Sequence, residues 1–406
     1  MCGKHLNSFW HRVPVPSDAI MRSDGSGEGS MMYVTGFDPL SYRRPLLARK
    51  ALPGLEVFYV KSLRRLGLIG NILFRFFLKT GKIEGMLCKR SRSGGDYYIS
   101  ALLRDFLESF EFKGLRRDAV IALNPYLASR VIWGDDATVI LDWMDVWMTP
   151  EGDLHPFDVI TAKRADGVIF WSKPMLEFIT KRLNLKRYVY VPYGIDSSIF
   201  NPRKYGNRKY FREKFGIKDK FMLLYSGGIW RVDNVDLQGT DKMLKAFALA
   251  SRKLGNVILV LQVARLDTFT LELIKRMRIK VKIIGAQPYA SFLRQSAFAA
   301  ADVLLAPGSE HPTAYYAEKM KFFQYMVTGK AIIAERTPGA LSALGDAALY
   351  VELGDIEGMA NAIVELLCNS ELREELGARA SERARLFEWE KLMPVYRDFV
   401  LKIVSP

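Results

Sequence analysis

The sequence predicts an α/β protein with two doubly wound, Rossmann-like domains facing each other across a cleft. Its 406 residues are enough for two separate hydrophobic cores. Short apolar runs alternate with helix-patterned segments along most of the chain, which is typical of parallel sheets covered by helices. A stretch with two prolines and a glycine, VPYGIDSSIFNP, divides this alternation into two series.

The first series predicts an N-terminal domain over residues 31–195. Its expected strands are Met32–Thr35, Glu56–Val60, Ala119–Leu123, Thr138–Leu141, Gly167–Trp171 and Tyr188–Val191, with helices at Arg44–Ala51 and Lys173–Leu183. Residues 1–30 lack periodicity and contain SDGSGEGS, so we expect a disordered tail, with Met31 or Met32 as a plausible start.

The second series predicts a C-terminal domain over residues 196–388, after charged, non-periodic residues that extend to about Asp219. Its expected strands are Phe221–Tyr225, Val257–Val263, Lys280–Ile284, Val303–Ala306, Ala331–Ala334 and Ala348–Val351. Its expected helices are Thr240–Leu254, Thr268–Arg278, Tyr289–Ala301, Tyr315–Val327, Ile356–Leu367 and Glu371–Phe387, and a last helix, Trp389–Ile403, closes the chain. The helix expected at Tyr315 begins beneath a strand-end loop, which favours an anion there.

The composition is that of a folded globular protein, 49% hydrophobic and 25% charged. The three cysteines, Cys2, Cys88 and Cys368, are far apart and predict neither a disulfide framework nor a metal site, which favours a reducing, cytoplasmic compartment. The four histidines are too dispersed for a metal cluster.

The net charge of +15 indicates an anionic partner. Nucleic acid is the least favoured partner, because no zinc-finger spacing, RNA-binding aromatic signature or basic heptad is present. Six cations fall within an arc of about 100° on a helical wheel: Lys61, Arg64, Arg65, Arg75, Lys79 and Lys82. This basic stripe is typical of a helix on an anionic membrane surface, and equally of a sheet-covering helix with a solvated edge.

Several local motifs occur in a specific order. They are ADGVI at 165–169 with Ser172, VPYGID at 191–196 with FNP at 200–202, YSGG at 225–228 with QG at 238–239, IGA at 284–286, ADV at 301–303 with Pro307, and KFFQYMVTGK at 321–330. Together, over about residues 31–389, they resemble the GT-B superfamily of nucleotide-sugar-dependent glycosyltransferases. The resemblance is strongest to the family 4-like, group 1 branch that acts in cell-envelope glycan synthesis.

The resemblance implies a donor nucleotide held without a metal or other cofactor, by backbone amides and cations. Gly227 and Gly228 would allow close approach to the diphosphate, and Gly285 lies in the run that leads to the donor pocket. The family's two phosphate-binding cations fall on Gly228 and Gln238 here, so Arg231 or Lys242 is expected to replace them. Lys321 is a third candidate.

The family's ribose-binding Glu falls on Gln324, which can still hydrogen-bond hydroxyl groups. The family's donor-sugar Glu falls on Tyr316, and Glu310, directly after a strand, is the candidate to serve instead. His311 is either a sugar contact or a loop histidine without a role.

The N-terminal domain is expected to supply the acceptor site. Asp142 and Asp145 follow a buried strand, so one is a candidate general base, or else caps the next segment. Asp38, Arg43 and Arg44, after the first strand, are expected to line the cleft. Arg43 and Arg44 would contact an acceptor phosphate, or else merely open a helix with Pro45 in its first turn. The resemblance also implies that residues 389–406 cross back onto the N-terminal domain.

We therefore expect a metal-independent glycosyltransferase of the hexosyltransferase type, retaining by resemblance, or inverting if Asp145 acts as a base. Its expected substrates are a nucleotide-sugar and a glycan or lipid-linked acceptor at the inner face of the membrane. Two alternatives remain: a nucleotide-sugar epimerase of the same fold, and a non-catalytic sugar-nucleotide binder. The second is kept open by Gly228, Gln238 and Gln324.

Overall fold

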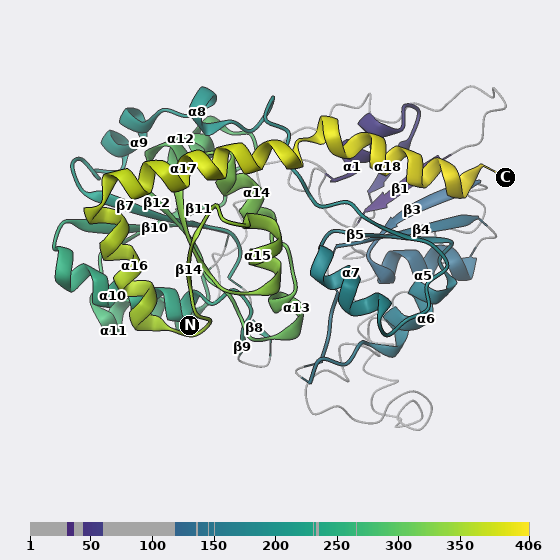
Figure 1. Cartoon of the computed structure of the whole chain (residues 1–406), viewed down its shortest axis with the longest axis horizontal. Helices are drawn as coiled ribbons and strands as arrows, with labels where there is room; N and C mark the ends of the chain where they lie inside the picture. Colours follow the sequence, from purple (N-terminus) through teal and green to yellow (C-terminus); the bar gives the residue numbers. More distant parts are fainter. Residues whose placement is uncertain are drawn as a thin grey trace, which may run out of the picture.

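The computed structural model describes residues 31–35, 44–59, 118–134, 137–144, 146–149, 151–229, 231–232, 235–264 and 266–405. These residues form two α/β domains, joined by the linker that follows the first sheet and by the last helix of the chain (Figure 1). Each domain is built on a six-stranded parallel sheet, which confirms the predicted fold class. The proposed tail and the basic stripe lie outside the described residues.

The N-terminal sheet has the strand order β2-β1-β3-β4-β5-β6. Its strands are β1 (Met31–Thr35), β2 (Glu56–Tyr59), β3 (Ala119–Leu123), β4 (Thr138–Trp143), β5 (Gly167–Phe170) and β6 (Tyr188–Tyr190). Strand β3 is buried along its whole length, because helices cover both faces of the sheet. Those helices are α1 (Arg44–Ala51), α5 (Pro125–Gly134), α6 (Pro156–Arg164) and α7 (Lys173–Thr180). Helix α1 lies on one face, and α5, α6 and α7 lie on the other (Figure 1).

The C-terminal sheet has the order β11-β10-β7-β12-β13-β14. Its strands are β7 (Phe221–Ser226), β10 (Val257–Val263), β11 (Val281–Gly285), β12 (Val303–Ala306), β13 (Ala331–Glu335) and β14 (Leu349–Val351), and β8 (Arg231–Val232) with β9 (Val235–Asp236) forms a small antiparallel ribbon. The strand order reverses between β7 and β12. In doubly wound sheets such a reversal opens a crevice at the carboxyl ends of the two strands.

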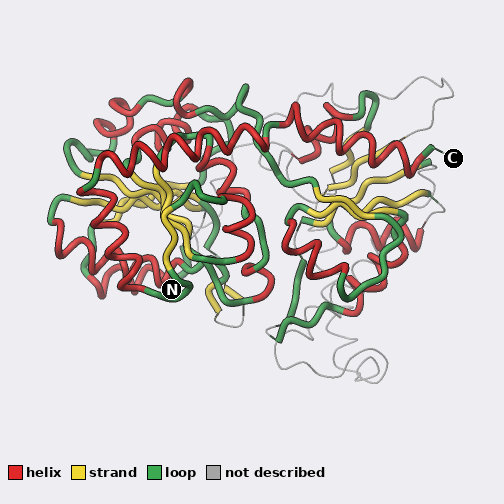
Figure 2. Tube along the Cα trace, in the orientation of Figure 1, coloured by secondary structure: helices red, strands yellow, loops and turns green. Residues whose placement is uncertain are grey.

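Helices flank both faces of this second sheet (Figure 2). They are α8 (Pro202–Tyr205), α9 (Arg208–Lys214), α10 (Thr240–Leu254), α11 (Thr268–Met277), α12 (Phe292–Ala300), α13 (Pro312–Tyr315), α14 (Met320–Met326), α15 (Pro338–Leu344), α16 (Ile356–Cys368) and α17 (Ser370–Ala384). Two expectations are corrected. The segment before Asp219, expected to be non-periodic, contains α8 and α9, and the single helix expected at Tyr315–Val327 is two short helices.

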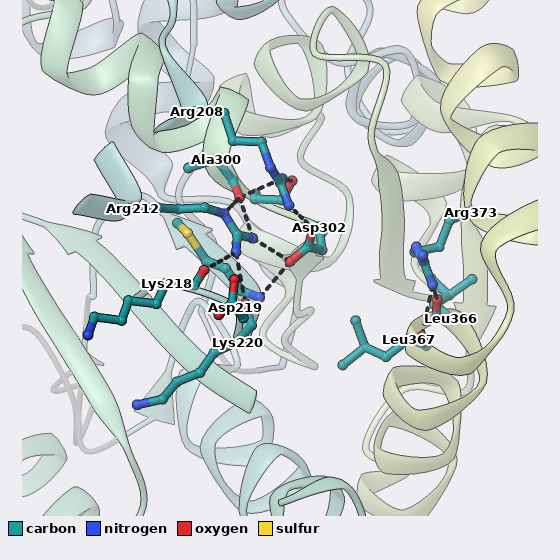
Figure 3. Close-up of polar contacts among 12 residues, drawn as sticks. Arg208, Arg212, Lys218, Asp219, Lys220, Ala300, Asp302, Leu366, Leu367 and Arg373 are labelled. Atoms are coloured by element: carbon teal, nitrogen blue, oxygen red, sulfur yellow. Dashed lines mark hydrogen bonds and ion pairs between the residues drawn. The ribbon is translucent and has the colours of Figure 1, made fainter. Parts of the chain in front are cut away.

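Arg212 explains why α9 forms despite its charged sequence. Its guanidinium donates to the carbonyl oxygens of Ala300, Lys218 and Lys220 at 2.9–3.2 Å, and it pairs with Asp302 at 2.6 Å (Figure 3). Asp302 also accepts the Met222 amide at 2.7 Å. These bonds tie α9 to the amino-terminal edge of the sheet, and they leave the carboxyl edge to other residues.

The last helix, α18 (Trp389–Val404), runs from the C-terminal domain across the N-terminal domain and packs against α1 (Figure 1). The Trp389 amide donates to the Ile195 carbonyl at 2.9 Å, and the Ile195 amide donates to the Phe387 carbonyl at 2.8 Å. Gly167 on β5 lets Phe399 and Ile403 lie against the backbone, since a Cβ there would come within 2.2 Å of Ile403. The linker that follows the first sheet is therefore hydrogen-bonded alongside the start of α18.

A buried ion pair lies at the centre of the N-terminal domain. Arg44 and Asp142 form a bidentate ion pair, with hydrogen bonds of 3.0 and 3.1 Å, and both side chains have 0% exposure. Tyr33 and Trp171 also donate to Asp142, at 2.8 and 2.6 Å. This corrects two expectations. Arg44 and Asp142 compensate each other's charge inside the domain and do not line the cleft.

The domains meet through residues 312–319, between β12 and α14. The side chain of Glu318 is buried and accepts hydrogen bonds from Tyr190 Oη at 2.5 Å and the Lys173 amide at 3.1 Å, both in the N-terminal domain. Ser342 of the C-terminal domain donates to the same carboxylate at 2.7 Å. Burial raises the pKa of Glu318, whereas these three hydrogen bonds lower it.

The same segment accepts two further interdomain hydrogen bonds. Ser172 Oγ donates to the Tyr316 carbonyl at 2.5 Å, and the Met148 amide donates to Thr313 Oγ1 at 2.9 Å. The Tyr316 ring packs on Phe178 of α7 with their centroids 4.8 Å apart. Tertiary contacts to the other domain therefore interrupt the helix that the local sequence predicts over Tyr315–Val327.

We predict that Arg44→Met lowers the free energy of unfolding by about 3–5 kcal/mol, because it leaves the Asp142 charge buried and unpaired. Urea denaturation would measure the change. Lys186→Met, which removes a solvent-exposed pair with Asp166, is the control, and we expect it to cost less than about 1 kcal/mol. Equal effects of the two substitutions would contradict a central role for the buried pair.

We predict that Glu318→Gln loosens the contact between the domains. An amide offers one acceptor oxygen where the carboxylate offers two, so the three donors can no longer all be satisfied. Hydrogen–deuterium exchange at the Lys173 amide is expected to accelerate, and small-angle scattering to show a more extended average shape. Glu352→Gln, at an exposed pair with Arg336, is the matched control. Unchanged exchange at the Lys173 amide would contradict a role for Glu318 in holding the two domains together.

Candidate functional site

The candidate site lies where the strand order reverses, at the carboxyl ends of β7 and β12. Gly239 adopts a left-handed conformation, with φ of +74°, and an added Cβ would lie 2.0 Å from the Gly308 carbonyl oxygen. Only glycine fits this approach, because the loop after β7 and the loop after β12 lie backbone against backbone. We call this place, residues 225–228, 238–239 and 307–308, the glycine corner.

Lys321 of α14 reaches into the glycine corner. Its Nζ donates to Tyr225 Oη at 2.9 Å and to Gln238 Oε1 at 3.1 Å, and an added Cβ on Gly227 would lie 2.9 Å from it. The side chain is only 7% exposed. Burial, and then the charge of Lys319, lower the pKa of Lys321 well below its ordinary value. The structure thus brings together four residues predicted for donor binding: Gly227, Gly228, Gln238 and Lys321.

Lys319 is a second lysine at this corner, and the sequence analysis did not select it. Its Nζ donates to the Pro307 carbonyl at 3.2 Å. Burial lowers its pKa to about 8, although the nearby charges of Glu335 and Asp236 act to raise it. Within the described part of the chain, neither Lys319 nor Lys321 forms an ion pair. The sequence signal that could have identified Lys319 was its spacing from Lys321: the two lysines are two positions apart where α14 begins.

The two acids near the corner are occupied by other groups. Asp236 accepts hydrogen bonds from the Gln238 amide, Thr240 Oγ1 and the Asp241 amide at 2.8–2.9 Å, and so fixes the turn into α10. Glu335 accepts the amides of Gly308 and Gly354 at 2.5 and 2.7 Å. Both carboxylates therefore shape the loops around the lysines and do not neutralise them directly.

Two cations expected to replace the family's phosphate ligands are already paired. Arg231 pairs with Asp241 at 2.5 Å and with Asp267 at 2.9 Å, and its hydrogen bond to Asp241 is the main reason that its pKa is raised. Lys242 pairs with Glu335 at 3.0 Å. The expectation that either stands free at the loop after β7 is therefore corrected, since neutralised cations attract a phosphate weakly.

The remaining donor-side residues lie around the corner. Gln324, one turn after Lys321, is buried and accepts a hydrogen bond from Arg294 at 2.9 Å. Gly285, at the end of β11, borders open space, because an added Cβ would meet no atom within 4 Å. Glu310 is exposed in the loop after β12, and His311 beside it is buried.

On the acceptor side, Asp38, Arg43 and Asp145 lie outside the described residues. Arg44 and Asp142 form the buried pair and are unavailable to a substrate. No group of three or more potential metal ligands occurs among the described residues. In the same residues, no helix combines the length and apolarity needed to cross a bilayer.

Comparisons with known proteins agree with this arrangement. Residues 220–369, which contain the glycine corner and both lysines, match the sequence model of the family "Glycosyl transferases group 1". A search of curated protein sequences finds no match.

Solved structures match more than nine-tenths of the chain at low sequence identity. Sucrose-phosphate synthase from Thermosynechococcus elongatus is 15% identical with a TM-score of 0.66, over 92% of this chain and 100% of that one. Trehalose 6-phosphate synthase from Burkholderia multivorans is 14% identical with a TM-score of 0.66, over 93% and 98%. Anabaena HepE in complex with UDP is 14% identical with a TM-score of 0.63, over 92% and 100%. The chain therefore has the GT-B fold, and its C-terminal domain carries the sequence pattern of the group 1 glycosyltransferases.

Proposed function

We propose that the protein transfers a hexose from a nucleoside-diphosphate donor to a glycan or lipid-linked acceptor, without a metal or other cofactor. The observation that carries the proposal is the glycine corner. It places the half-buried Lys319 and the buried Lys321 beside closely approaching backbone, and no carboxylate of the described residues bonds either lysine. The corner lies inside the segment that matches the glycosyltransferase family.

The corner is suited to stabilising a leaving diphosphate. Lysine N–H groups and backbone amides donate to phosphate oxygens, and charge-assisted hydrogen bonds of this kind are strongest where water is excluded. The similar structure of Anabaena HepE is a complex with UDP, so uridine diphosphate is the first nucleotide to test. Asp142 is held in its ion pair, so the proposed retaining reaction does not draw on it as a base, and Asp145, the candidate base of an inverting reaction, lies outside the described residues.

A lipid-linked acceptor would place the protein at the inner, cytoplasmic face of the membrane. The net charge of +15 supports this part of the proposal. The cations expected to contact anionic lipid, Lys61, Arg64, Arg65, Arg75 and Lys79, lie outside the described residues. Liposome flotation of a variant lacking these five charges tests it, and unchanged lipid binding would count against it.

A second candidate function is a sugar-nucleotide binder without catalytic activity. The observation that favours it concerns Tyr316, at the position of the family's donor-sugar glutamate, because Tyr316 packs in the interdomain contact. Consumption of a nucleotide-sugar with membrane extract or a defined acceptor distinguishes transfer from binding alone.

We predict that one of UDP, GDP and ADP raises the thermal midpoint of the wild-type protein, and that Lys321→Met weakens its binding about tenfold or more. The substitution removes a hydrogen bond from a cation to phosphate, which contributes roughly 1.5–3 kcal/mol. Isothermal titration measures the affinity. Lys253→Met, on the exposed side of α10, is the control. If no diphosphate stabilises the wild type, the donor-site assignment is wrong.

We predict that diphosphate binding at neutral pH takes up protons. In the free protein the pKa of Lys321 is far below its ordinary value, and a bound phosphate favours the charged form. Lys319, with a pKa of about 8, loses its charge as the pH rises through that value, so affinity is expected to fall between about pH 7 and about pH 9. Titration in buffers of different ionisation enthalpy measures the uptake. Binding without proton exchange, in both wild type and Lys321→Met, would contradict this linkage.

A further inference from the structure

Arg294 of α12 is a third cation, and it contacts α14, the helix that carries Lys321. Its Nη1 donates to the Gln287 carbonyl at 3.2 Å, and its Nη2 donates to Gln324 Oε1 at 2.9 Å. Its Nε is buried without a hydrogen-bond partner in the described structure. Burial lowers the pKa of Arg294, so its positive charge is held at a cost.

No carboxylate pairs with Arg294 among the residues that the structure describes. Beyond the two oxygens that it bonds, the guanidinium is bordered by aromatic rings: its carbon lies 6.0, 5.8 and 6.0 Å from the ring centroids of Phe200, Tyr289 and Phe298. These distances are at the outer limit of a cation–π contact, which is weaker than an ion pair. Arg294 is half-buried with its Nε fully covered, and a charge held partly out of water without a counter-charge destabilises a fold, so its retention points to a ligand that supplies the negative charge.

The neutral side chain of Gln324 leaves the charge of Arg294 uncompensated. An arginine only donates hydrogen bonds, so Gln324 must present its oxygen to Arg294 and remains neutral. A glutamate at position 324 would be in place to form an ion pair with Arg294. Gln324 and Lys321 are three residues apart on α14 and therefore share one side of the helix. Gln324 therefore connects the Arg294 guanidinium to the helix that carries Lys321.

We infer that Arg294 is a third cation of the donor pocket, and that the neutral side chain of Gln324 leaves its charge available to the nucleotide diphosphate. This inference rests on the proposed donor site and specifies how that site recognises its anion. The pocket then relies on three weakly compensated cations: Lys319 and Lys321 at the corner, and Arg294 behind Gln324. A glutamate at position 324 would weaken the attraction.

The isosteric substitution Gln324→Glu tests the inference, because the inference predicts the direction in which the affinity for diphosphates changes. We expect the affinity for inorganic pyrophosphate, and for the nucleoside diphosphate that binds best among UDP, GDP and ADP, to fall by about tenfold. The thermal midpoint without ligand is expected to rise, because the introduced carboxylate would neutralise Arg294. A carboxylate that served the ribose would tighten nucleoside diphosphate binding and leave pyrophosphate unaffected, and that result would overturn the inference.

Arg294→Met provides an independent variant, because methionine can fill the space among the three aromatic rings. Its affinity for pyrophosphate is expected to fall by a factor similar to that for Gln324→Glu, without a fall in the thermal midpoint. The controls are Arg379→Met and Asn361→Asp, which make the same charge changes on exposed helices. Unchanged pyrophosphate affinity in a folded Arg294→Met protein would assign Arg294 a structural role only.

The two proposals fail in different ways. If the wild-type protein binds none of the three diphosphates, the proposed function fails and the inference fails with it. If the wild type binds a diphosphate and the Gln324→Glu and Arg294→Met proteins bind it equally well, only the role of Arg294 is rejected.

Discussion

The arrangement of the two domains depends on one buried ion pair, between Arg44 and Asp142. Besides holding Asp142, Arg44 donates to the carbonyl oxygens of Pro192 and Val191 at 2.8 and 3.0 Å, so the beginning of the linker is fixed to the N-terminal domain. The rings of Trp171 and Tyr396 lie 4.9 and 5.0 Å from the guanidinium carbon, and Tyr396 belongs to α18. One pair of charges therefore joins α1, β4, the linker and the returning helix. We therefore expect rotation between the domains to occur beyond Pro192, where Ile195 is hydrogen-bonded to Phe387 and to Trp389 at the start of α18.

The structure contains two kinds of buried positive charge, and the difference separates scaffold from site. Arg44 and Arg212 each face a carboxylate and several carbonyl oxygens, so their charges are compensated within the fold. Among the described residues, Lys321 and Arg294 hydrogen-bond only neutral oxygens, and burial lowers the pKa of both. A fold gains nothing in stability from an uncompensated charge, whereas a phosphate site requires one. This distinction also argues against Arg231 and Lys242 as phosphate ligands, because carboxylates already compensate their charges. Their positions in the sequence alone had favoured them.

The sequence predicted the sheet architecture well because both domains rely on local periodicity. The structure has α10 and β10 with the predicted bounds, and their apolar patterns are continuous. Predictions that depended on distant partners were less successful. Arg44 and Asp142 are 98 residues apart, so nothing local revealed that each neutralises the other. The helix expected at Tyr315–Val327 is interrupted because Glu318 bonds the other domain. At the site, the glycines and Lys321 belong to a compact motif and could be identified, whereas Arg294 becomes relevant only through its contact with Gln324.

The segment from Thr313 to Lys321 links the two halves of the proposed reaction. Thr313, Tyr316 and Glu318 bond the N-terminal domain, and Lys319 and Lys321 follow immediately at the glycine corner. Because Glu318 lies one position before Lys319 and three before Lys321, we expect a shift between the domains to move the lysines relative to Gly227. The non-helical turn at 317–319 is therefore more than a break in a predicted helix. It connects the fit of the domains to the position of the charge that would receive the leaving diphosphate, so closure of the cleft and stabilisation of the leaving group depend on the same few residues.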